Sequence, residues 1–421
     1  MRIQRAVPCA VFILTLSVVS SLTAQPNQQV SERAEHYRPE ALTLLEKLVN
    51  IDSGTGDEKG VEQVSALVVN ELTKIGAHIE SFPSTPVAGN NVVATFTGTG
   101  KGKILLIAHM DTVFSKGTAS ARPFRVDGSR AYGPGVGDDK GGLVAALYSL
   151  KILHDLDFRD YGQISLLLNT NEETGSVGSR VLIEKIAKQH DVVLNCEAGR
   201  SSDGVVIWRK GWAVAQIEVK GKAAHAGAAP ETGRNAAVEL AHQILQLGKL
   251  GDAEKLTTIN FTVLKAGDKP NVIPDHAVAL GDVRATTTQE FDRLEKDLSR
   301  VSQNKLIADT EVKVTLTRKV PPMPKNEKTD AMAAKAQAIY GELGRKLTLE
   351  GSGGASDASF SAGVGVPSLD GLGIVGGGFH APEEYVEVGS IVPRLYLLTR
   401  MLMELGRGEL LKTGSRVRGA F

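Results

Sequence analysis

The chain has 421 residues, more than a single compact core usually holds, so two domains are expected. Its 48 basic and 48 acidic residues leave no formal net charge, and without a basic excess the chain is not expected to bind nucleic acid. A hydrophobic content of 42% and a charged content of 23% are typical of globular proteins. Composition therefore favours a globular protein and gives no sign of a nucleic-acid partner.

Residues 1–24 have the pattern of a secretory signal peptide. Arg2 and Arg5 precede an apolar stretch, and Ala24 is a small residue suited to cleavage. A membrane anchor is the alternative, but serines and a threonine dilute the stretch, whereas about 20 strongly apolar residues would be expected. Cleavage after Ala24 predicts a secreted or periplasmic protein without a membrane segment. Cys196 would then be its one cysteine, which excludes an intrachain disulfide.

Strands and helices alternate from Tyr37 to Cys196. Apolar spacing predicts helices over 39–50, 58–75, 141–154 and 176–189, and strands over 91–97, 104–108, 163–169 and 191–196. These strands are apolar almost throughout; residues 104–108, for example, read Ile-Leu-Leu-Ile-Ala. A sheet covered by helices on both faces requires such strands.

The pattern changes after Trp208. Strands are expected over 213–219, 258–265, 277–285 and 311–317, and helices over 235–247 and 289–304. The order β-α-β-β-α-β is that of a ferredoxin-like module. Prolines at 321, 322 and 324 mark a linker, after which helices are expected over 329–343 and 392–405.

The predicted fold class is α/β, with a mostly parallel sheet covered by helices and an inserted ferredoxin-like α+β domain. His380 lies in the last part of the chain, far from the other candidate site residues. If it joins them, residues 25–209 and 320–421 form one catalytic domain. Residues 210–319 would then be inserted into that domain.

Residues suited to metal binding follow several predicted strands. Because the carboxyl ends of parallel strands meet in one crevice, these side chains are expected to converge. Histidine with several carboxylates and no thiolate is the ligand chemistry of catalytic zinc. The pattern predicts a two-metal hydrolase whose candidate ligands and site residues are His109, Asp111, Asp138, Asp139, Glu172, Glu173, Glu197 and His380.

His109 and Asp111 form a His-x-Asp pair. In extended backbone they share a side, so Asp111 can accept a hydrogen bond from the imidazole and fix its tautomer. A strand-end histidine beside a solvated aspartate is the alternative. The Gly-rich loop at 133–142 contains Asp138, whose carboxylate can bridge two cations, although an aspartate capping the following helix is also common.

Glu172 and Glu173 repel each other unless a cation offsets their charge. We expect one to be a metal ligand and the other a general base, although surface Glu-Glu pairs are common. His225 lies on a turn of small residues, free to reach a ligand, but an ordinary loop histidine is the alternative. The chain contains neither a nucleophile elbow nor a Walker loop.

Several motifs together resemble a known family. They are Ala-His109-Met-Asp111-Thr, Gly-Pro-Gly-Val-Gly-Asp138-Asp139-Lys-Gly-Gly, Asn-Glu172-Glu173-Thr-Gly-Ser, Glu197 and Lys-Ala-Ala-His225-Ala-Gly. They are similar to those of the di-zinc metallopeptidase family that includes glutamate carboxypeptidase, acetylornithine deacetylase and succinyl-diaminopimelate desuccinylase. The resemblance runs from about residue 44 to residue 405 and is greatest to secreted bacterial glutamate carboxypeptidases of the carboxypeptidase G type.

The resemblance implies a role for each site residue. Two zinc ions per subunit would share Asp138. His109 and Glu197 would complete one site, and Glu173 and His380 the other. Glu172 would be the general base and Asp111 the partner of His109. The peptide between Asp138 and Asp139 is expected to be cis.

The resemblance also implies that the inserted module forms a homodimer. His225 would reach the partner subunit's active site and polarise the scissile carbonyl there. Asn271, Arg284 and the loop at Gly353 and Gly354 would hold the free carboxylate of the substrate. The chain departs from the glutamate carboxypeptidases at Val320, where they carry a second arginine, and at residues 353–357, which read Gly-Gly-Ala-Ser-Asp. We therefore expect apolar C-terminal residues to be accepted as well.

These observations predict a secreted zinc exopeptidase that hydrolyses the amide bond to a C-terminal amino acid in small peptides. A deacylase acting on N-acyl amino acids by the same mechanism is the alternative. A binding protein that kept the fold without catalysis is a third possibility. Glu172 argues against it, because a binding protein needs no base beside its ligand.

Overall fold

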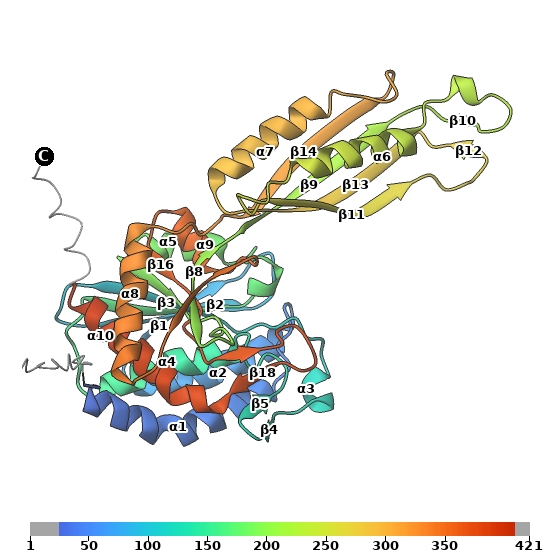
Figure 1. Cartoon of the computed structure of the whole chain (residues 1–421). Helices are drawn as coiled ribbons and strands as arrows, with labels where there is room; N and C mark the ends of the chain where they lie inside the picture. The colour runs from blue at the N-terminus through green and yellow to red at the C-terminus, as the bar shows by residue number, and fades with distance from the viewer. Residues whose placement is uncertain (1–24, 409–421) are drawn as a thin grey trace, which may run out of the picture.

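The computed structural model describes residues 25–408 (Figure 1). The predicted signal peptide, residues 1–24, lies outside this range. Among the described residues, no helix is both long enough and apolar enough to cross a membrane.

A six-stranded sheet forms the centre of the larger lobe (Figure 1). Its four adjacent strands in the order β6-β3-β7-β16 are parallel, and β2 and β1 extend one edge in antiparallel pairing. The mostly parallel sheet is therefore confirmed. Its strands are β1 (His78–Pro83), β2 (Asn90–Thr97), β3 (Lys103–His109), β6 (Gln163–Asn169), β7 (Val192–Asn195) and β16 (Ser368–Leu369).

Both faces of this sheet are covered, as the apolar strands predict. Along β3, Leu106 packs into the larger apolar core, whereas its neighbours Leu105 and Ile107 pack into a second core on the opposite face. Successive side chains of a strand point to opposite faces, so each face needs its own helical layer. The first layer contains α1 (Gln28–Val49), α2 (Glu58–Lys74), α4 (Lys140–Asp155), α8 (Glu327–Glu342) and α10 (Ile391–Gly406), and the second contains α5 (Arg180–Ala187) and α9 (Ala358–Gly363).

Two helices differ from their predicted limits. α1 begins at Gln28, capped by the Asn27 side chain, and continues through Pro39, where the sequence pattern predicts its start. α5 begins only at Arg180, because Ser176 has a φ of 53°, which no helix residue adopts. The apolar spacing identified both helices but not where they begin.

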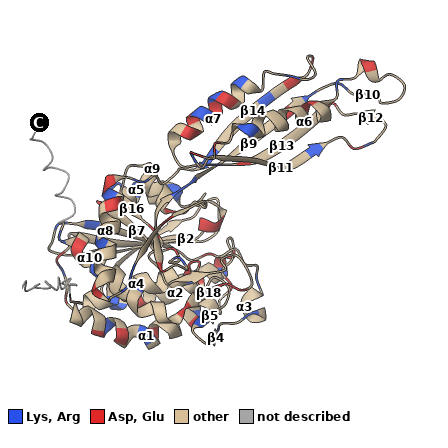
Figure 2. Ribbon diagram, viewed as in Figure 1, with Lys and Arg blue, Asp and Glu red and all other residues tan. Residues whose placement is uncertain are grey.

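The inserted lobe contains an antiparallel sheet in the order β11-β13-β9-β14, with α6 and α7 packed on one face (Figure 1). The chain order β9-α6-β11-β13-α7-β14 is the predicted ferredoxin-like order. Basic and acidic residues are interspersed along the ribbon of α7 (Figure 2). The elements are β9 (Gly211–Lys220), α6 (Ala236–Leu247), β11 (Thr258–Ala266), β13 (His276–Ala285), α7 (Thr288–Val301) and β14 (Glu311–Val320).

The inserted lobe has its own apolar core, whose buried members all lie between Ala213 and Leu298. Val320, at the end of β14, instead packs with Phe360 in the core of the larger lobe. We propose 210–319 as the limits of the inserted domain, and 25–209 with 320–421 as those of the catalytic domain.

Shorter elements connect these parts. β8 (Gly204–Arg209) pairs in parallel with β15 (Thr348–Ser352), and both strands lead toward the metal-ligand side of the larger lobe. The sequence pattern predicts neither strand, since each borders a turn-rich region. The remaining elements are α3 (Thr118–Ala121), β4 (Arg125–Asp127), β5 (Arg130–Tyr132), β10 (Ala224–His225), β12 (Val272–Ile273), β17 (Gly376–Gly377) and β18 (Tyr385–Glu387).

Candidate metal centre

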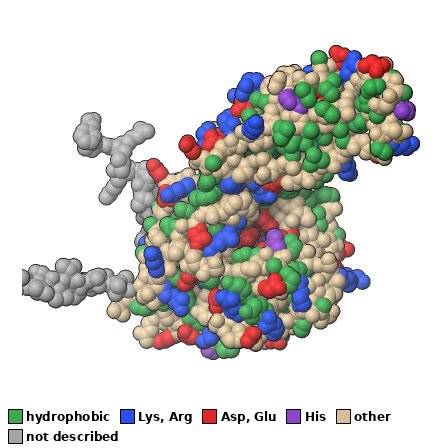
Figure 3. All heavy atoms as spheres, turned by 45° about the vertical axis from the view of Figure 1, so that its right-hand side comes forward, with side chains coloured by type: hydrophobic (Ala, Val, Ile, Leu, Met, Phe, Trp, Pro, Cys, Tyr) green, Lys and Arg blue, Asp and Glu red, His purple; other side chains and the backbone are tan. Residues whose placement is uncertain are grey.

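The predicted ligands converge at the carboxyl ends of the parallel strands. His109 ends β3, Glu172 and Glu173 follow β6, and Glu197 follows β7. Figure 3 shows acidic side chains, a histidine and basic side chains around a hollow below the inserted lobe. The cavity there has a volume of about 190 Å³ and is lined by Asp138, Glu172, Glu173, Glu197, Ala198, Arg200, Arg209, Ser352, Gly354, Ala355, Phe379 and His380.

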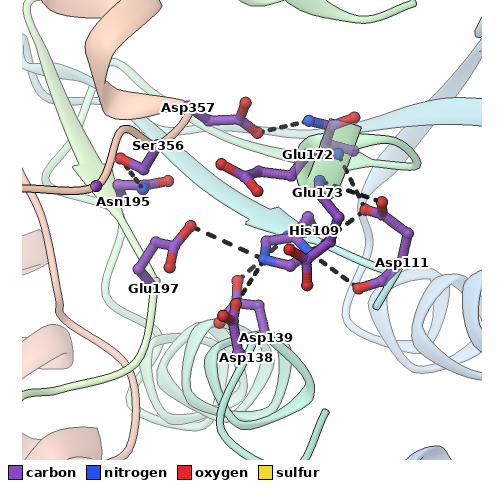
Figure 4. A network of polar contacts seen from close by, with 12 residues as sticks. His109, Asp111, Asp138, Asp139, Glu172, Glu173, Asn195, Glu197, Ser356 and Asp357 are labelled. Atoms are coloured by element: carbon purple, nitrogen blue, oxygen red, sulfur yellow. Dashed lines mark hydrogen bonds and ion pairs between the residues drawn. The ribbon is translucent and has the colours of Figure 1, made fainter. Parts of the chain in front are cut away.

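Asp138 contacts two histidines, and Figure 4 shows its carboxylate beside one of them, His109. Its Oδ1 is 3.0 Å from His109 Nε2, and its Oδ2 is 3.1 Å from His380 Nε2. Glu197 Oε1 lies 3.8 Å from His109 Nε2, and Glu173 Oε2 lies 3.2 Å from His380 Nε2. This is the grouping that the family resemblance implies. The peptide between Asp138 and Asp139 is cis, as expected.

Two compact triads of possible ligands overlap with this grouping without matching it. One joins His109 with Asp138 and Glu173, and the other joins His109 with Glu172 and Glu197. Glu172 is thus close enough to be a ligand itself. Its assignment as the general base stays a prediction.

The side chains of this site are suited to binding cations. Glu173 Oε1 and Asp139 Oδ1 are buried without a hydrogen-bond partner among the described residues. Burial and the neighbouring Asp138 raise the pKa of Glu197 to about 8, and burial also raises the pKa of Glu172 and Glu173. Buried carboxylates that repel one another ionise at neutral pH only when positive charge is added. The donor set suits divalent cations such as zinc.

Asp111 contacts more residues of the site than the sequence predicts. The imidazole Nδ1 of His109 lies 3.0 Å from the backbone carbonyl of Asp111 and 3.4 Å from its carboxylate, so the nearer partner is the backbone. The carboxylate instead accepts hydrogen bonds from Thr55 Oγ1 at 2.6 Å and from the backbone N–H groups of Glu172 at 3.1 Å and Glu173 at 3.3 Å. It therefore orients both glutamates.

Glu384 fixes the loop that carries Asp138. It accepts hydrogen bonds from the backbone N–H groups of Gly135 at 3.2 Å, Gly137 at 2.9 Å and Asp138 at 3.0 Å. Burial raises its pKa to about 7. Glu384 is not among the predicted site residues, although its position four residues after His380 in a second Glu-Glu pair is a usable signal.

Arg209 also lines the cavity and contacts the glycine-rich loop there. It is buried, pairs with Asp370, and lies 4.0 Å from Glu197 Oε2. It also donates hydrogen bonds to Ser352 Oγ at 3.4 Å and to the carbonyls of Gly354 and Ala355 at 3.3 Å. Arg209 thus ties the Gly353–Gly354 loop to a predicted ligand, a role that no local sequence pattern reveals.

The predicted substrate-binding residues fall into two groups. Gly354 lines the cavity, and Gly353 precedes it in the same loop. Arg284 pairs with Asp282 at 3.0 Å and lies over the Trp212 ring, next to the end of β13. It is therefore on the part of the inserted sheet nearest the larger lobe (Figure 1).

His225 and Asn271 lie together, away from the predicted ligands. His225 is in β10 at the far end of the inserted lobe (Figure 1), and Asn271 accepts a hydrogen bond from the backbone of Ala226. His225 is exposed, and its Nδ1 accepts hydrogen bonds from the backbone N–H groups of Gly227 at 3.2 Å and Ala228 at 3.0 Å. In the neutral imidazole the proton is therefore on Nε2, which can donate outward.

Comparison with known proteins agrees with this geometry. The family model "Peptidase family M20/M25/M40" matches residues 105–404. Carboxypeptidase G2 from Pseudomonas sp. (strain RS-16) is 39% identical over 411 residues, which cover 97% of this chain and 99% of the relative.

Solved structures share the fold. Aminopeptidase PepT from Bacillus cereus has a TM-score of 0.77 at 22% identity, over 87% of this chain and 98% of that one. A dinuclear metal binding peptidase of the M20 family from Bacillus subtilis has a TM-score of 0.68 at 16% identity, over 88% of this chain and 98% of that one. The chain belongs to peptidase family M20/M25/M40, whose members are metal-dependent hydrolases.

Proposed function

We propose that the protein is a secreted di-zinc exopeptidase that hydrolyses the amide bond to a C-terminal amino acid. The observation that carries this proposal is the position of Asp138, whose two carboxylate oxygens face His109 and His380 from opposite sides. A carboxylate shared in this way suits two cations. The 39% identity of the chain to Carboxypeptidase G2 supports the carboxypeptidase activity.

The ligands divide as the resemblance implies. Asp138 would be shared, His109 and Glu197 would complete one zinc site, and Glu173 and His380 would complete the other. Bound zinc would supply Lewis-acid chemistry, which polarises a carbonyl and makes water more acidic. Glu172 accepts the proton of the attacking water and passes it to the leaving nitrogen. The Asp111 carboxylate keeps Glu172 in position by accepting a hydrogen bond from the backbone N–H of Glu172.

Substrate recognition requires a free carboxylate in this proposal. Arg284 supplies a cation from the inserted domain, and the Gly353–Gly354 loop supplies backbone donors beside the cavity. Asn271 contributes from the end of the inserted domain. An N-acyl amino acid carries the same carboxylate and the same amide, so deacylation of such substrates is the alternative function.

The inserted domain would also form a homodimer. β11 is an edge strand with exposed Val263 and Leu264, and α6 exposes Val238 and Leu245. Exposed apolar residues on an open sheet edge favour pairing with a second copy. Dimerisation would bring His225 to the partner subunit's cavity, where its Nε2–H would donate to the developing oxyanion.

Metal analysis and substrate profiling test the proposal together. Washed protein should contain two zinc ions per subunit and should cleave dipeptides or N-acetyl amino acids. Amidation of the substrate's C-terminus should remove most of the rate. Equal cleavage of free and amidated substrates would contradict the exopeptidase assignment, and full activity with one zinc or none would contradict the metal assignment.

Secretion and assembly need separate measurements. The N-terminus of protein recovered outside the cytoplasm should be Gln25, and light scattering should give the mass of a dimer. A protein that keeps its first 24 residues, or that stays monomeric while active, would contradict these parts of the proposal alone.

A further inference from the structure

Arg200 is a charged residue of the cavity to which neither the metal chemistry nor the packing gives a role. It follows Glu197 by three residues and lines the same cavity as the predicted ligands. Its side chain is half-buried and has no hydrogen-bond or ion-pair partner among residues 25–408. A guanidinium stays charged in proteins, and desolvating it without a partner is unfavourable.

The other buried arginines nearby have both an ion-pair partner and carbonyl acceptors. Arg209 pairs with Asp370 and donates to carbonyls of the glycine loop. Arg394 pairs with Asp203 at 3.1 Å and donates to the carbonyls of Gly371 and Gly204. Arginines that only support the fold have such partners here, which separates Arg200 from them.

The acidic groups near Arg200 are already occupied. Glu350 accepts hydrogen bonds from Thr348 and Ser202, and Asp370 is paired with Arg209. Glu197 is a predicted zinc ligand. Burial and the like charge of Arg209 lower the pKa of Arg200, and the neighbouring carboxylates of Asp370, Glu197 and Glu350 offset these effects only in part. An anion from outside the protein would remove this imbalance.

The backbone of Arg200 is fixed in a tight turn. Its N–H donates to the carbonyl of Gly204 at 3.1 Å, and its carbonyl accepts from Asp203 N–H at 2.8 Å. Because the turn leads directly into β8, which is paired with β15, the side chain is presented to the cavity from an ordered part of the backbone. A rigidly held arginine is suited to bidentate recognition of a carboxylate.

We propose that Arg200 binds a side-chain carboxylate of the substrate's C-terminal residue and so favours acidic residues at that position. The inference rests on the proposed function, in which Arg284 and the Gly353–Gly354 loop hold the α-carboxylate. It departs from the expectation drawn from Val320, which is buried in the core of the larger lobe. Arg200, from the catalytic domain, would take the place of the arginine that glutamate carboxypeptidases carry at the position of Val320.

Paired substrates test this inference. Dipeptides ending in Glu and in Gln differ by one charge and have nearly the same shape, so the ratio of their KM values reports recognition of the side-chain carboxylate. The native zinc enzyme should prefer Glu. Arg200→Met should raise KM for the Glu substrate by roughly tenfold to a hundredfold, which is the effect of losing a hydrogen bond between charged groups. KM for the Gln substrate should change little. Arg200→Lys should restore part of the preference.

A matched control and a binding measurement complete the test. Arg159→Met removes an exposed arginine outside the cavity and should leave the ratio unchanged. Calorimetry on the zinc-loaded protein should show tighter binding of free L-glutamate than of L-glutamine, and Arg200→Met should abolish the difference.

Three outcomes would overturn the inference. One is an unchanged Glu-to-Gln ratio in Arg200→Met, and another is an equal loss for both substrates. The third is a loss confined to discrimination between free and amidated C-termini, which would place the α-carboxylate at Arg200. If the native enzyme cleaves neither dipeptides nor N-acyl amino acids, the proposed function fails instead, and the calorimetric comparison still tests Arg200.

Discussion

Replacement of Asp111 by asparagine should weaken the metal centre without removing any ligand. The carboxylate is fully buried and accepts hydrogen bonds from Thr55 and from the backbone N–H groups of Glu172 and Glu173, which reach different oxygens. An asparagine has only one acceptor oxygen. Whichever way its amide is turned, one of the two backbone donors faces an NH2 group and loses its partner.

The size of the effect follows from that count. Loss of one hydrogen bond to a charged group costs about 1.5–3 kcal/mol, which corresponds to about a tenfold to hundredfold change in an equilibrium constant. We expect zinc affinity, measured by competition with a chromogenic chelator, to fall by this factor in Asp111→Asn. The turnover number at saturating zinc should fall too, because Glu172 is no longer held in position.

Thr55→Val is the matched control. It removes the hydroxyl bonded to Asp111 but leaves both backbone donors paired, and water can replace the hydroxyl because Thr55 is only half-buried. Its effect should be smaller than that of Asp111→Asn. If Asp111→Asn binds zinc and turns over substrate like the native protein, Asp111 does not orient the two glutamates.

Other substitutions test the remaining assignments. Glu172→Gln should keep its zinc and lose about 10²–10⁴-fold in turnover, whereas Glu173→Gln should lose zinc; metal analysis with kinetics would reveal a reversed pair. His225→Ala should be nearly inactive with zinc bound, and mixing it with Glu172→Gln under subunit exchange should restore activity; a mixture that exchanges and stays inactive excludes donation between subunits. Arg209→Met should lower the free energy of unfolding by about 3–5 kcal/mol, because the buried carboxylate of Asp370 loses its ion-pair partner. Denaturant unfolding would measure this, and Arg209→Met with Asp370→Asn should recover part of the loss.

Local sequence determined most elements of the fold. The apolar strands and the helical spacing gave the central sheet, its two helical layers and the ferredoxin-like order of the inserted lobe. Helix starts were less predictable. Pro39 lies inside α1 although proline normally marks a boundary, and Ser176 interrupts the pattern of α5 through its backbone conformation. Both depend on the surrounding structure rather than on apolar spacing.

The candidate ligands could be found from the sequence because each follows a strand or a glycine-rich loop. His109, Glu172 and Glu197 end adjacent strands, and parallel strands bring their carboxyl ends together. The placement of His380 opposite the second oxygen of Asp138 was suggested only by the family resemblance, because the two residues lie far apart in the chain.

Only the tertiary structure decided which residues support that site. The bonds from Glu384 to the Asp138 loop and from Arg209 to the glycine loop join segments more than a hundred residues apart. Arg200 and Arg209 are both arginines beside the same cavity, yet one has acceptors and the other has none among the described residues. Sequence determined the chemical type of each side chain and the local backbone that carries it. Which partners it meets depends on how distant segments pack, because hydrogen bonds and charge pairing act through space rather than along the chain.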